Sequence, residues 1–519
     1  MRVGRSRKRA LVGACALAFT ASAGYGVPVL ATDGAASVSQ PGADQLAGCR
    51  ITTPAVAYHP GGVAVVPQPA GAPVPCLVAT GFGGSEPQVV SLKDGSLVYE
   101  PAVVTPGIAG TGFLPGAPGP RPSTQFSPGG LAISRDNGAT WSFNQPAGAT
   151  WVPQDDALYV DRRTGRLFYY ALAANPIPQA GEVPLQDQLP AGEAHLMMSP
   201  DGGGTWNEVG LVGFVESENP RFTSAPPPPG QPIPAGYRDV VYWCGNNAVN
   251  LGEPLPGYRA CFRSLDGGIT WNQVSILDSG PLPQHAECGS NAETFTDMDP
   301  NYPEGAPDGS LYAEVQCGST TFLARSRDEA QTWPLVEGKS GQPVTVPANG
   351  ELRVDDDGNL YLAYQDGPTS VELRVSSDGG VTWRGALDMA PPRIGPITQW
   401  AFAERGSEVA VSYLVQRGSE SLYDGYLSVT LNARAADPVF WSAALNPPSD
   451  PMRTSAPPSA RDDFIGVDIT PSGAPWGAYA GSCPGPVASA NGSACSGEQS
   501  NPEANEAVAG RLAWPDQGS

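Results

Sequence analysis

The sequence is poor in basic residues and in charged residues altogether. Only 15 % of its 519 residues are charged, and lysine and histidine occur three times each. Acidic residues outnumber Lys and Arg by 51 to 29, so the formal net charge is −22. Because affinity for nucleic acid depends on clustered Lys and Arg, this composition excludes a nucleic-acid partner.

The scarcity of histidine and the spacing of the cysteines also limit the chemistry. Three scattered histidines, at positions 59, 195 and 285, argue against a Ser-His-Asp triad. No cysteines have the C-x-x-C spacing that is typical of zinc sites. Eight cysteines follow residue 31, an even number that favours four structural disulfides in an oxidising compartment. Their positions fall into the close pairs Cys49–Cys76, Cys244–Cys261, Cys288–Cys317 and Cys483–Cys495.

Long apolar runs are absent after residue 31. A bilayer-crossing helix needs about 20 apolar residues, so we expect no membrane span. Residues 1–31 combine five basic residues, the apolar segment ALVGACALAF and small residues before cleavage sites after Ala23 or Ala31, which is the pattern of a secretory signal. Cys15 lies inside the apolar segment rather than after it, which argues against a lipid anchor. We therefore expect a secreted, extracellular, soluble protein.

Glycine and proline are abundant, with 64 and 56 residues. Both oppose long helices, because an interior Gly costs about 1 kcal/mol and an interior Pro about 3 kcal/mol relative to Ala. Hydrophobic residues still make up 40 % of the chain, enough for a core. The composition therefore predicts an all-β fold with many turns.

Five octamers with the pattern Ser-x-Asp-x-Gly-x-Thr-Trp dominate the middle of the chain. They are SRDNGATW (134–141), SPDGGGTW (199–206), SLDGGITW (264–271), SRDEAQTW (326–333) and SSDGGVTW (376–383). In a tight turn between antiparallel strands, the Asp accepts hydrogen bonds from nearby backbone N–H groups and the Gly supplies a positive φ. The fourth octamer has Ala330 in place of this Gly, so its turn should be strained or differently shaped.

These octamers resemble Asp boxes, and the chain resembles the sialidase-like, or BNR-repeat, β-propellers. The resemblance implies that each octamer closes the hairpin between the third and fourth strands of a blade. It is specific for the fold and weakly specific for function. We therefore interpret the octamer aspartates as structural: Asp136, Asp201, Asp266, Asp328 and Asp378.

Tryptophans that end successive strand groups allow the blades to be counted. These are Trp141, Trp206, Trp271, Trp333, Trp383, Trp441 and Trp514, which predict one propeller of seven blades. Sialidases usually have six blades, so six is the alternative. We expect a signal peptide at 1–31, a linker at 32–52 and the propeller at 53–519. A strand within residues 53–81 should pair with the last blade and close the ring.

The candidate site lies on the face opposite the octamers. Three long insertions fall on that face, at residues 105–128, 174–193 and 223–236. Binding residues often lie on such loops, although Pro-rich insertions can also simply lengthen connections. Residues that enter each inner strand should surround the mouth of the central channel.

The sialidase resemblance implies three arginines that bind a substrate carboxylate, a Tyr nucleophile with a Glu partner, and an Asp as acid/base. The candidate catalytic residues are Arg221, Arg393, Arg461, Glu293 and Tyr413, with Tyr423 as an alternative nucleophile. The candidate ligand-binding residues are Trp151, Asp155, Asp156, Arg353, Trp400, Asp462 and Asp463. The Phe/Tyr-Arg-Ile-Pro signature of the first sialidase arginine is absent, and Glu86 stands in that region instead.

The many acids leave three chemistries open at this mouth. Arginines could bind an acidic sugar, two carboxylates could act on a neutral glycan, or oxygen ligands could hold Ca²⁺. We expect a monomeric, glycan-engaging propeller that partners an extracellular glycan or glycoprotein. If it is an enzyme, the resemblance implies a glycoside hydrolase of exo-α-sialidase type. The alternative is a non-catalytic protein-binding propeller in extracellular adhesion or assembly, which needs an exposed apolar patch.

Overall fold

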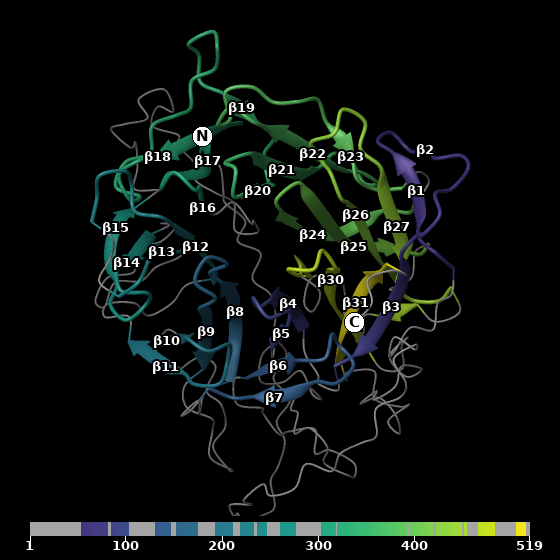
Figure 1. The fold of residues 1–519 in the computed structure, drawn as a ribbon, viewed down its shortest axis with the longest axis horizontal. Coiled ribbons are helices and arrows are strands. Elements are labelled where there is room, and N and C mark those ends of the chain that lie inside the picture. The colour runs from purple at the N-terminus through teal and green to yellow at the C-terminus, as the bar shows by residue number, and fades with distance from the viewer. Residues whose placement is uncertain are drawn as a thin grey trace, which may run out of the picture.

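A computed structural model of the chain shows sheets arranged around a common centre (Figure 1). The structure describes residues 53–80, 85–102, 130–146, 152–174, 193–210, 218–232, 236–246, 260–276, 303–317, 319–391, 394–418, 422–448, 451–453, 465–482 and 505–514. Within these ranges the regular elements are all strands. In particular, none of these residues forms a helix that is long and apolar enough to cross a membrane. The fold is therefore all-β, as predicted.

Seven antiparallel sheets form seven blades. Blade 1 contains β4 (Ser85–Ser91), β5 (Leu97–Ala102), β6 (Leu131–Ser134) and β7 (Ser142–Asn144). Blade 2 contains β8 (Val152–Val160), β9 (Leu167–Ala174), β10 (Glu193–Ser199) and β11 (Asn207–Gly210). Blade 3 contains β12 (Glu218–Ala225), β13 (Val240–Asn246), β14 (Ala260–Ser264) and β15 (Asn272–Ile276). Blade 4 contains β16 (Glu304–Gly305), β17 (Leu311–Cys317), β18 (Thr320–Ser326) and β19 (Thr345–Val346).

Two of the remaining three blades include strands from early in the chain. Blade 5 contains β20 (Gly350–Val354), β21 (Leu360–Gln365), β22 (Val371–Ser376) and β23 (Leu387–Asp388). Blade 6 contains β24 (Ile397–Arg405), β25 (Glu408–Gln416), β26 (Leu422–Thr430) and β27 (Phe440–Ala444), extended by β1 (Val56–His59), β2 (Val63–Ala64) and β28 (Met452–Arg453). Blade 7 contains β29 (Gly466–Ile469), β30 (Pro475–Ser482), β31 (Asn505–Ala513) and β3 (Val74–Ala79). The count of seven is confirmed, and the six-blade alternative is wrong.

The first strand of each blade is the inner one, and the inner strands contact one another in a closed ring. The contacts run from β4 to β8, β12, β16, β20, β24, β29 and back to β4. The ring is completed by a strand from early in the chain, because β3 pairs with β31 over the register Val74↔Ala513 to Ala79↔Val508. This pairing leaves blade 7 with four strands rather than an open edge.

The middle strands are mostly apolar because neighbouring blades cover both of their faces. In β21 (LYLAYQ) the first five residues are buried, and in β25 (EVAVSYLVQ) seven consecutive residues are buried. Outer strands are shorter, with three residues in β7 and two in β23. The core therefore lies between blades, where one blade's side chains pack against the next.

All five octamers form the same turn between the third and fourth strands of blades 1 to 5. In each of these octamer turns the Asp accepts hydrogen bonds from the Thr backbone N–H, the Thr hydroxyl and the Ser hydroxyl, for example from Thr205 and Ser199 to Asp201. The fourth and fifth residues of every turn have positive φ. The fifth residue abuts the preceding blade, so a Cβ added at Gly380 would lie 2.2 Å from a Leu323 methyl group. The octamer turns therefore fasten blades together.

The fourth octamer turn keeps this shape without glycine. Ala330 has φ 65° and the preceding Glu329 has φ 58°. The Ala330 N–H still donates to the Ser326 hydroxyl at 3.0 Å. Because a left-handed conformation is unfavourable for residues with a Cβ, the turn is strained rather than reshaped. The methyl group of Ala330 is fully buried against blade 3.

One disulfide lies wholly within the described residues. Cys244 and Cys261 face each other on β13 and β14 and are bonded, as the spacing predicted. Cys76 and Cys317 are also disulfide-bonded. Their expected partners Cys49 and Cys288, and the expected pair Cys483–Cys495, lie outside the described residues.

Candidate functional site

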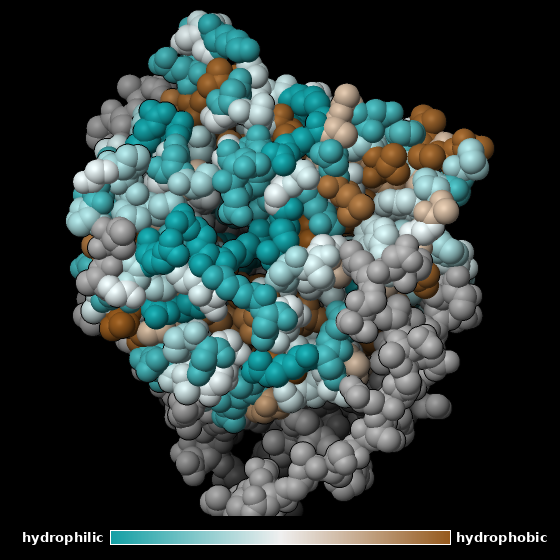
Figure 2. Space-filling view, viewed as in Figure 1, coloured by the Kyte–Doolittle hydropathy of each residue, from teal (hydrophilic) through white to brown (hydrophobic). Residues whose placement is uncertain are grey.

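A cavity of about 580 Å³ lies at the centre of the ring, and every inner strand contributes to its lining. Hydrophilic side chains gather around the central hollow on the face shown in Figure 2. Within the described lining there are seven carboxylates and five arginines. They are Asp161, Glu304, Glu351, Asp355, Asp356, Glu404 and Asp468, and Arg162, Arg163, Arg221, Arg353 and Arg405.

Most of these charges lie at the carboxyl ends of the inner strands. Asp161 follows β8, Asp355 follows β20, and Glu404 and Arg405 end β24. All inner strands begin their blades, so their ends gather at one rim, beside the turns of the first hairpins. Those turns share a face with the octamer turns, since the Lys93 ammonium donates to the Arg163 carbonyl and a Cβ at Gly202 would touch Leu92. The charges at the carboxyl ends therefore lie on the octamer side. Arg221, Glu304 and Glu351 instead stand in the first halves of their strands, toward the face that the sequence predicted.

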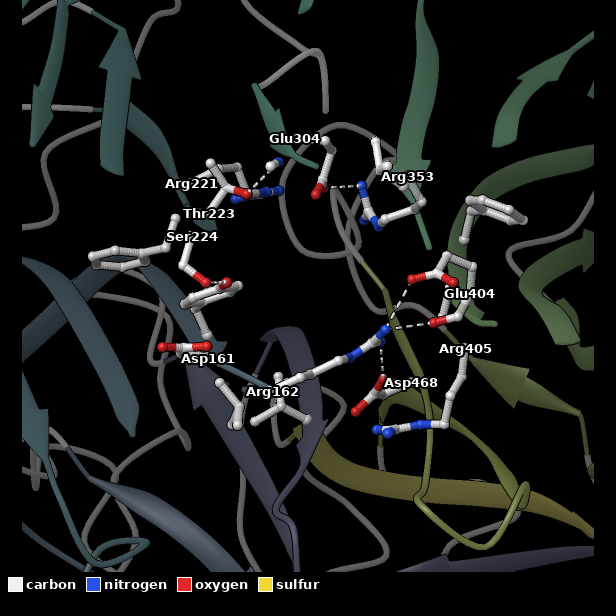
Figure 3. Close-up of a pocket in the computed structure, with 18 of the residues that line it drawn as sticks. Asp161, Arg162, Arg221, Thr223, Ser224, Glu304, Arg353, Glu404, Arg405 and Asp468 are labelled. Atoms are coloured by element: carbon white, nitrogen blue, oxygen red, sulfur yellow. Dashed lines mark hydrogen bonds and ion pairs between the residues drawn. The ribbon is translucent and has the colours of Figure 1, made fainter. Parts of the chain in front are cut away.

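Arg162 spans the cavity and joins three blades (Figure 3). Its guanidinium donates to the Glu404 carbonyl at 2.7 Å and to the Glu404 carboxylate at 2.9 Å. The other nitrogen donates to the Asp468 carboxylate at 3.1 Å. Asp468 also accepts from the backbone N–H and the hydroxyl of Ser91, at 2.6 and 2.7 Å. Blades 2, 6 and 7 are thus connected through one arginine, and Asp468 links this group to blade 1.

Arg353 forms a second charged group with the carboxylates of blades 4 and 5 (Figure 3). Its guanidinium donates to Glu304 at 3.0 Å and lies 3.6 Å from the Glu351 carboxylate. Glu351 in turn accepts the Phe402 backbone N–H at 2.6 Å. Arg221 lines the same cavity from β12 and interacts electrostatically with Glu351. Blades 3, 4 and 5 therefore supply neighbouring charges to one space.

Burial inside the ring makes three of the carboxyl groups weaker acids than usual, those of Glu304, Glu351 and Glu404. Burial raises the pKa of Glu304 to about 7 although Arg353 opposes the shift. Burial likewise raises the pKa of Glu404 to about 7 against the effect of Arg162. The pKa of Glu351 is also raised by burial. Glu304 and Glu404 can therefore carry a proton near neutral pH.

The described residues contain no group of three or more His, Cys, Asp or Glu side chains that could hold a metal ion. Four of the cavity carboxylates instead pair with Arg162 or Arg353, namely Glu304, Glu351, Glu404 and Asp468. Within this part of the chain, the arrangement can bind hydroxyl groups and exchange protons through carboxyl groups.

Two of the sequence-predicted residues meet in the cavity, Arg221 and Arg353. Two others do not. Tyr413 is fully buried, and its hydroxyl bonds to the hydroxyls of Ser428 and Ser442, so it belongs to the core and is no nucleophile. Trp400 packs against the same core.

Eight of the remaining candidates have side chains outside the described part of the structure. Asp155 and Asp156 lie in β8, but nothing is described of their side chains. Arg393, Arg461, Glu293, Trp151, Asp462 and Asp463 lie outside the described residues. The alternative nucleophile Tyr423 is described, and it is buried in the core with its neighbour Met452.

Sequence reasoning missed Arg162, Glu304, Glu404 and Asp468. A usable signal was present, because charged residues stand at or next to the end of several inner strands, just before the first hairpin turn: VDRRTG, VDDDG and AERG. The prediction looked at the opposite ends of those strands.

No protein-family profile matches the chain. It is 26 % identical over 368 residues to a sialidase of Micromonospora viridifaciens, covering 58 % of this chain and 53 % of that protein. The chain thus spans about half the length of this curated relative. Solved structures with similarity include a Hadza microbial sialidase (TM-score 0.38, 16 % identity, 70 % of this chain and 66 % of that one). Another is the intramolecular trans-sialidase of Ruminococcus gnavus (TM-score 0.36, 13 % identity, 85 % and 97 %).

The sequence relative and the observed arrangement of blades agree on one description. Seven blades surround a polar central cavity, and five of them contain the same Asp-containing turn between their third and fourth strands. The chain is a sialidase-like β-propeller.

Proposed function

We propose that this chain is an exported glycosidase that binds the end of a glycan in its central cavity. One observation carries the proposal: Arg221, Glu304 and Arg353 stand on three consecutive inner strands and face one cavity. A volume of about 580 Å³ lies within the range of small-ligand sites. Similarity to a sialidase over 368 residues supports a sugar as the ligand.

Glu304 is the proposed acid of the reaction. Its side chain is 23 % exposed, so it is reachable from the cavity. With a pKa of about 7, a fraction of Glu304 is protonated at neutral pH. The proton passes to the glycosidic oxygen as the bond to the anomeric carbon breaks. Water then adds to that carbon, and a neighbouring carboxylate of the cavity takes the proton that water releases.

The test is release of 4-methylumbelliferone from a panel of its glycosides by the purified full chain. Arg221→Ala and Glu304→Gln should each lower the rate at least about tenfold, in line with the loss of one positioned group. Arg135→Ala, an exposed arginine of the first octamer turn, is the matched control and should keep the rate. Because Glu304 acts protonated, the wild-type rate should fall as pH rises above about 7. Equal rates for the three variants would contradict the proposal.

The alternative function, docking of a protein, has weaker support from the surface. Three of the six exposed large hydrophobic residues described are valines in or next to β1 and β2, namely Val56, Val63 and Val66, at 51, 64 and 86 %. Leu265, Ile269 and Leu431 are exposed elsewhere. Three valines form a small patch compared with a protein interface. The cavity therefore favours a glycan over a protein partner.

A further inference from the structure

We propose that the central cavity selects neutral sugars, which carry no carboxylate, over acidic sugars such as uronic and sialic acids. This inference rests on the proposed function, because it names the substrate class of the same cavity. It follows from the partners that the cavity's arginines already have.

At least four of the five arginines in the described lining have partners in the protein itself. Arg162 and Arg353 form the ion pairs described above. The Arg405 guanidinium donates to the Ile469 carbonyl at 2.6 Å. Arg163 lies 3.4 Å from the Asp239 carboxylate. Recognition of a sugar carboxylate needs an arginine whose two N–H groups can turn to it, and these guanidiniums are engaged.

An acidic sugar would have to displace an internal carboxylate. If it took Arg353, Glu304 would lose the guanidinium that lies 3.0 Å from it. Leaving a partly buried carboxylate without its cation is unfavourable. The sugar's own charge would also enter a lining in which described carboxylates outnumber arginines by seven to five. Both effects weaken the binding of an anion.

Neutral sugar hydroxyls match the same groups without displacement. A hydroxyl can donate to Glu304, whose carboxylate has lone pairs beyond the one that Arg353 uses. The Thr223 hydroxyl accepts the Gly305 N–H at 2.8 Å, so its own proton can be donated to a ligand oxygen. Both Thr223 and Glu304 line the cavity (Figure 3). Tyr159 and Phe222 add aromatic surface to this polar lining.

The decisive ligands are a pair that differ at one carbon. Phenyl β-glucoside and phenyl β-glucuronide share every atom of the ring, but the second has a carboxylate in place of the C6 hydroxymethyl group. The panel also includes a second matched pair, phenyl galactoside and phenyl galacturonide. The phenyl glycosides of N-acetylglucosamine and N-acetylneuraminic acid add a neutral and an acidic amino sugar. Saturation-transfer NMR on the full chain at pH 8 measures binding whether or not hydrolysis occurs.

The wild-type chain should bind at least one neutral glycoside about tenfold more tightly than its acidic counterpart, equivalent to about 1.4 kcal/mol. Glu304→Gln removes one charge and the nearer of the two carboxylates that hold Arg353, so the neutral-to-acidic ratio should fall about tenfold. Glu351→Gln removes the second of these carboxylates and should shift the ratio in the same direction, which keeps the test available if the first variant does not fold. Asp437→Asn removes a charge that is 71 % exposed and should leave the ratio unchanged.

The outcomes separate the two proposals. Tighter binding of the acidic member of each pair would overturn the selectivity and leave the glycan-binding function in place. An unchanged ratio in both Glu304→Gln and Glu351→Gln would overturn the role assigned to Arg353. Absence of binding by every glycoside would contradict the proposed function itself.

Discussion

The octamer turns and the central cavity both depend on carboxylates, yet their environments push those carboxylates in opposite directions. The pKa of Asp201 is lowered, first by the Thr205 backbone N–H that donates to it. The pKa values of Glu304 and Glu404 are raised to about 7 by burial, even with arginines beside them. Neutral donors at the surface therefore hold an ionised, structural acid, whereas crowding inside the ring produces acids that can exchange a proton.

This contrast predicts that changes in the turns alter stability and that changes in the cavity alter ligand binding. The largest expected effect is at Gly380. Gly380→Ala adds a Cβ 2.2 Å from a Leu323 methyl group and places a side chain at φ 85°. We expect a loss of about 3 kcal/mol in the free energy of unfolding from overpacking and backbone strain together. Gly385→Ala is the control, because no atom lies within 4 Å of its Cβ position. Chemical denaturation of both variants measures the difference, and equal losses would contradict the fastening role of the turn.

Arg162→Met tests the cavity where it also supports the ring. Glu404 and Asp468, whose side chains are 5 and 10 % exposed, would lose their shared guanidinium. We expect a loss of about 2 to 3 kcal/mol at pH 8, toward the lower end of the range for breaking a buried ion pair. The loss should shrink at pH 5, where Glu404 is protonated. Adding Glu404→Gln to Arg162→Met should recover part of the stability at pH 8. No recovery would show that an unpaired Glu404 carboxylate is not the cause of the loss.

Asp378→Ala tests a turn without adding bulk. The variant loses the hydrogen bonds that Asp378 accepts from the Thr382 N–H and hydroxyl and from the Ser376 hydroxyl. We expect a loss of about 2 kcal/mol, since hydrogen bonds to a charged acceptor are stronger than neutral ones. Asp366→Ala, at an exposed position between β21 and β22, serves as control. A thermal midpoint that is the same for the two variants would refute the structural role.

The opposite pKa shifts predict that the free energy of unfolding is greatest at an intermediate pH. The pKa of Asp378 is lowered from 3.8 on balance, its hydrogen bonds to Thr382 outweighing burial, so its contribution is present above that value and lost as pH falls below it. Burial raises the pKa of Glu404 from 4.5 to about 7, so its contribution is present below 4.5 and lost as pH rises through 7. Calorimetry from pH 3 to 9 should show a flatter decline between pH 4.5 and 7 in Glu404→Gln than in the wild-type chain. Parallel profiles would contradict the raised pKa.

Ala330→Gly should have the smallest effect. Glycine relieves a left-handed alanine at φ 65°, worth about 1 kcal/mol. The change also removes a fully buried methyl group, which costs about 0.8 kcal/mol. We expect a net change below about 0.5 kcal/mol by chemical denaturation. A gain of more than about 1 kcal/mol would show that the Ala330 methyl group contributes nothing to the contact with blade 3.

The fold was predictable because its signals are local. Asp136 and Gly138 act within one turn, and their pattern repeats along the sequence. The closing tryptophans then gave the number of blades. Cys244 and Cys261 are 17 residues apart in sequence, which made their pairing predictable too.

The candidate site was less predictable because it depends on contacts across the ring. Arg162 meets Glu404 and Asp468 at separations of 242 and 306 residues. No local pattern encodes such a meeting, although Arg221 and Arg353 were found because they stand on inner strands. Tyr413 was misassigned because the sequence of an apolar strand does not show what a tyrosine hydroxyl on it faces. Here the hydroxyl faces other hydroxyls in the core and not a cavity.

The most direct test of the contrast is the affinity of one neutral glycoside for three proteins: the wild-type chain, Glu304→Gln and Asp378→Asn. Each variant removes one carboxylate charge, one from the cavity and one from a turn. The account predicts at least about a tenfold loss of affinity for Glu304→Gln, comparable with the loss of one charged hydrogen bond. It predicts wild-type affinity with a lowered thermal midpoint for Asp378→Asn. Equal affinities for the two variants would contradict the assignment of ligand binding to the central cavity.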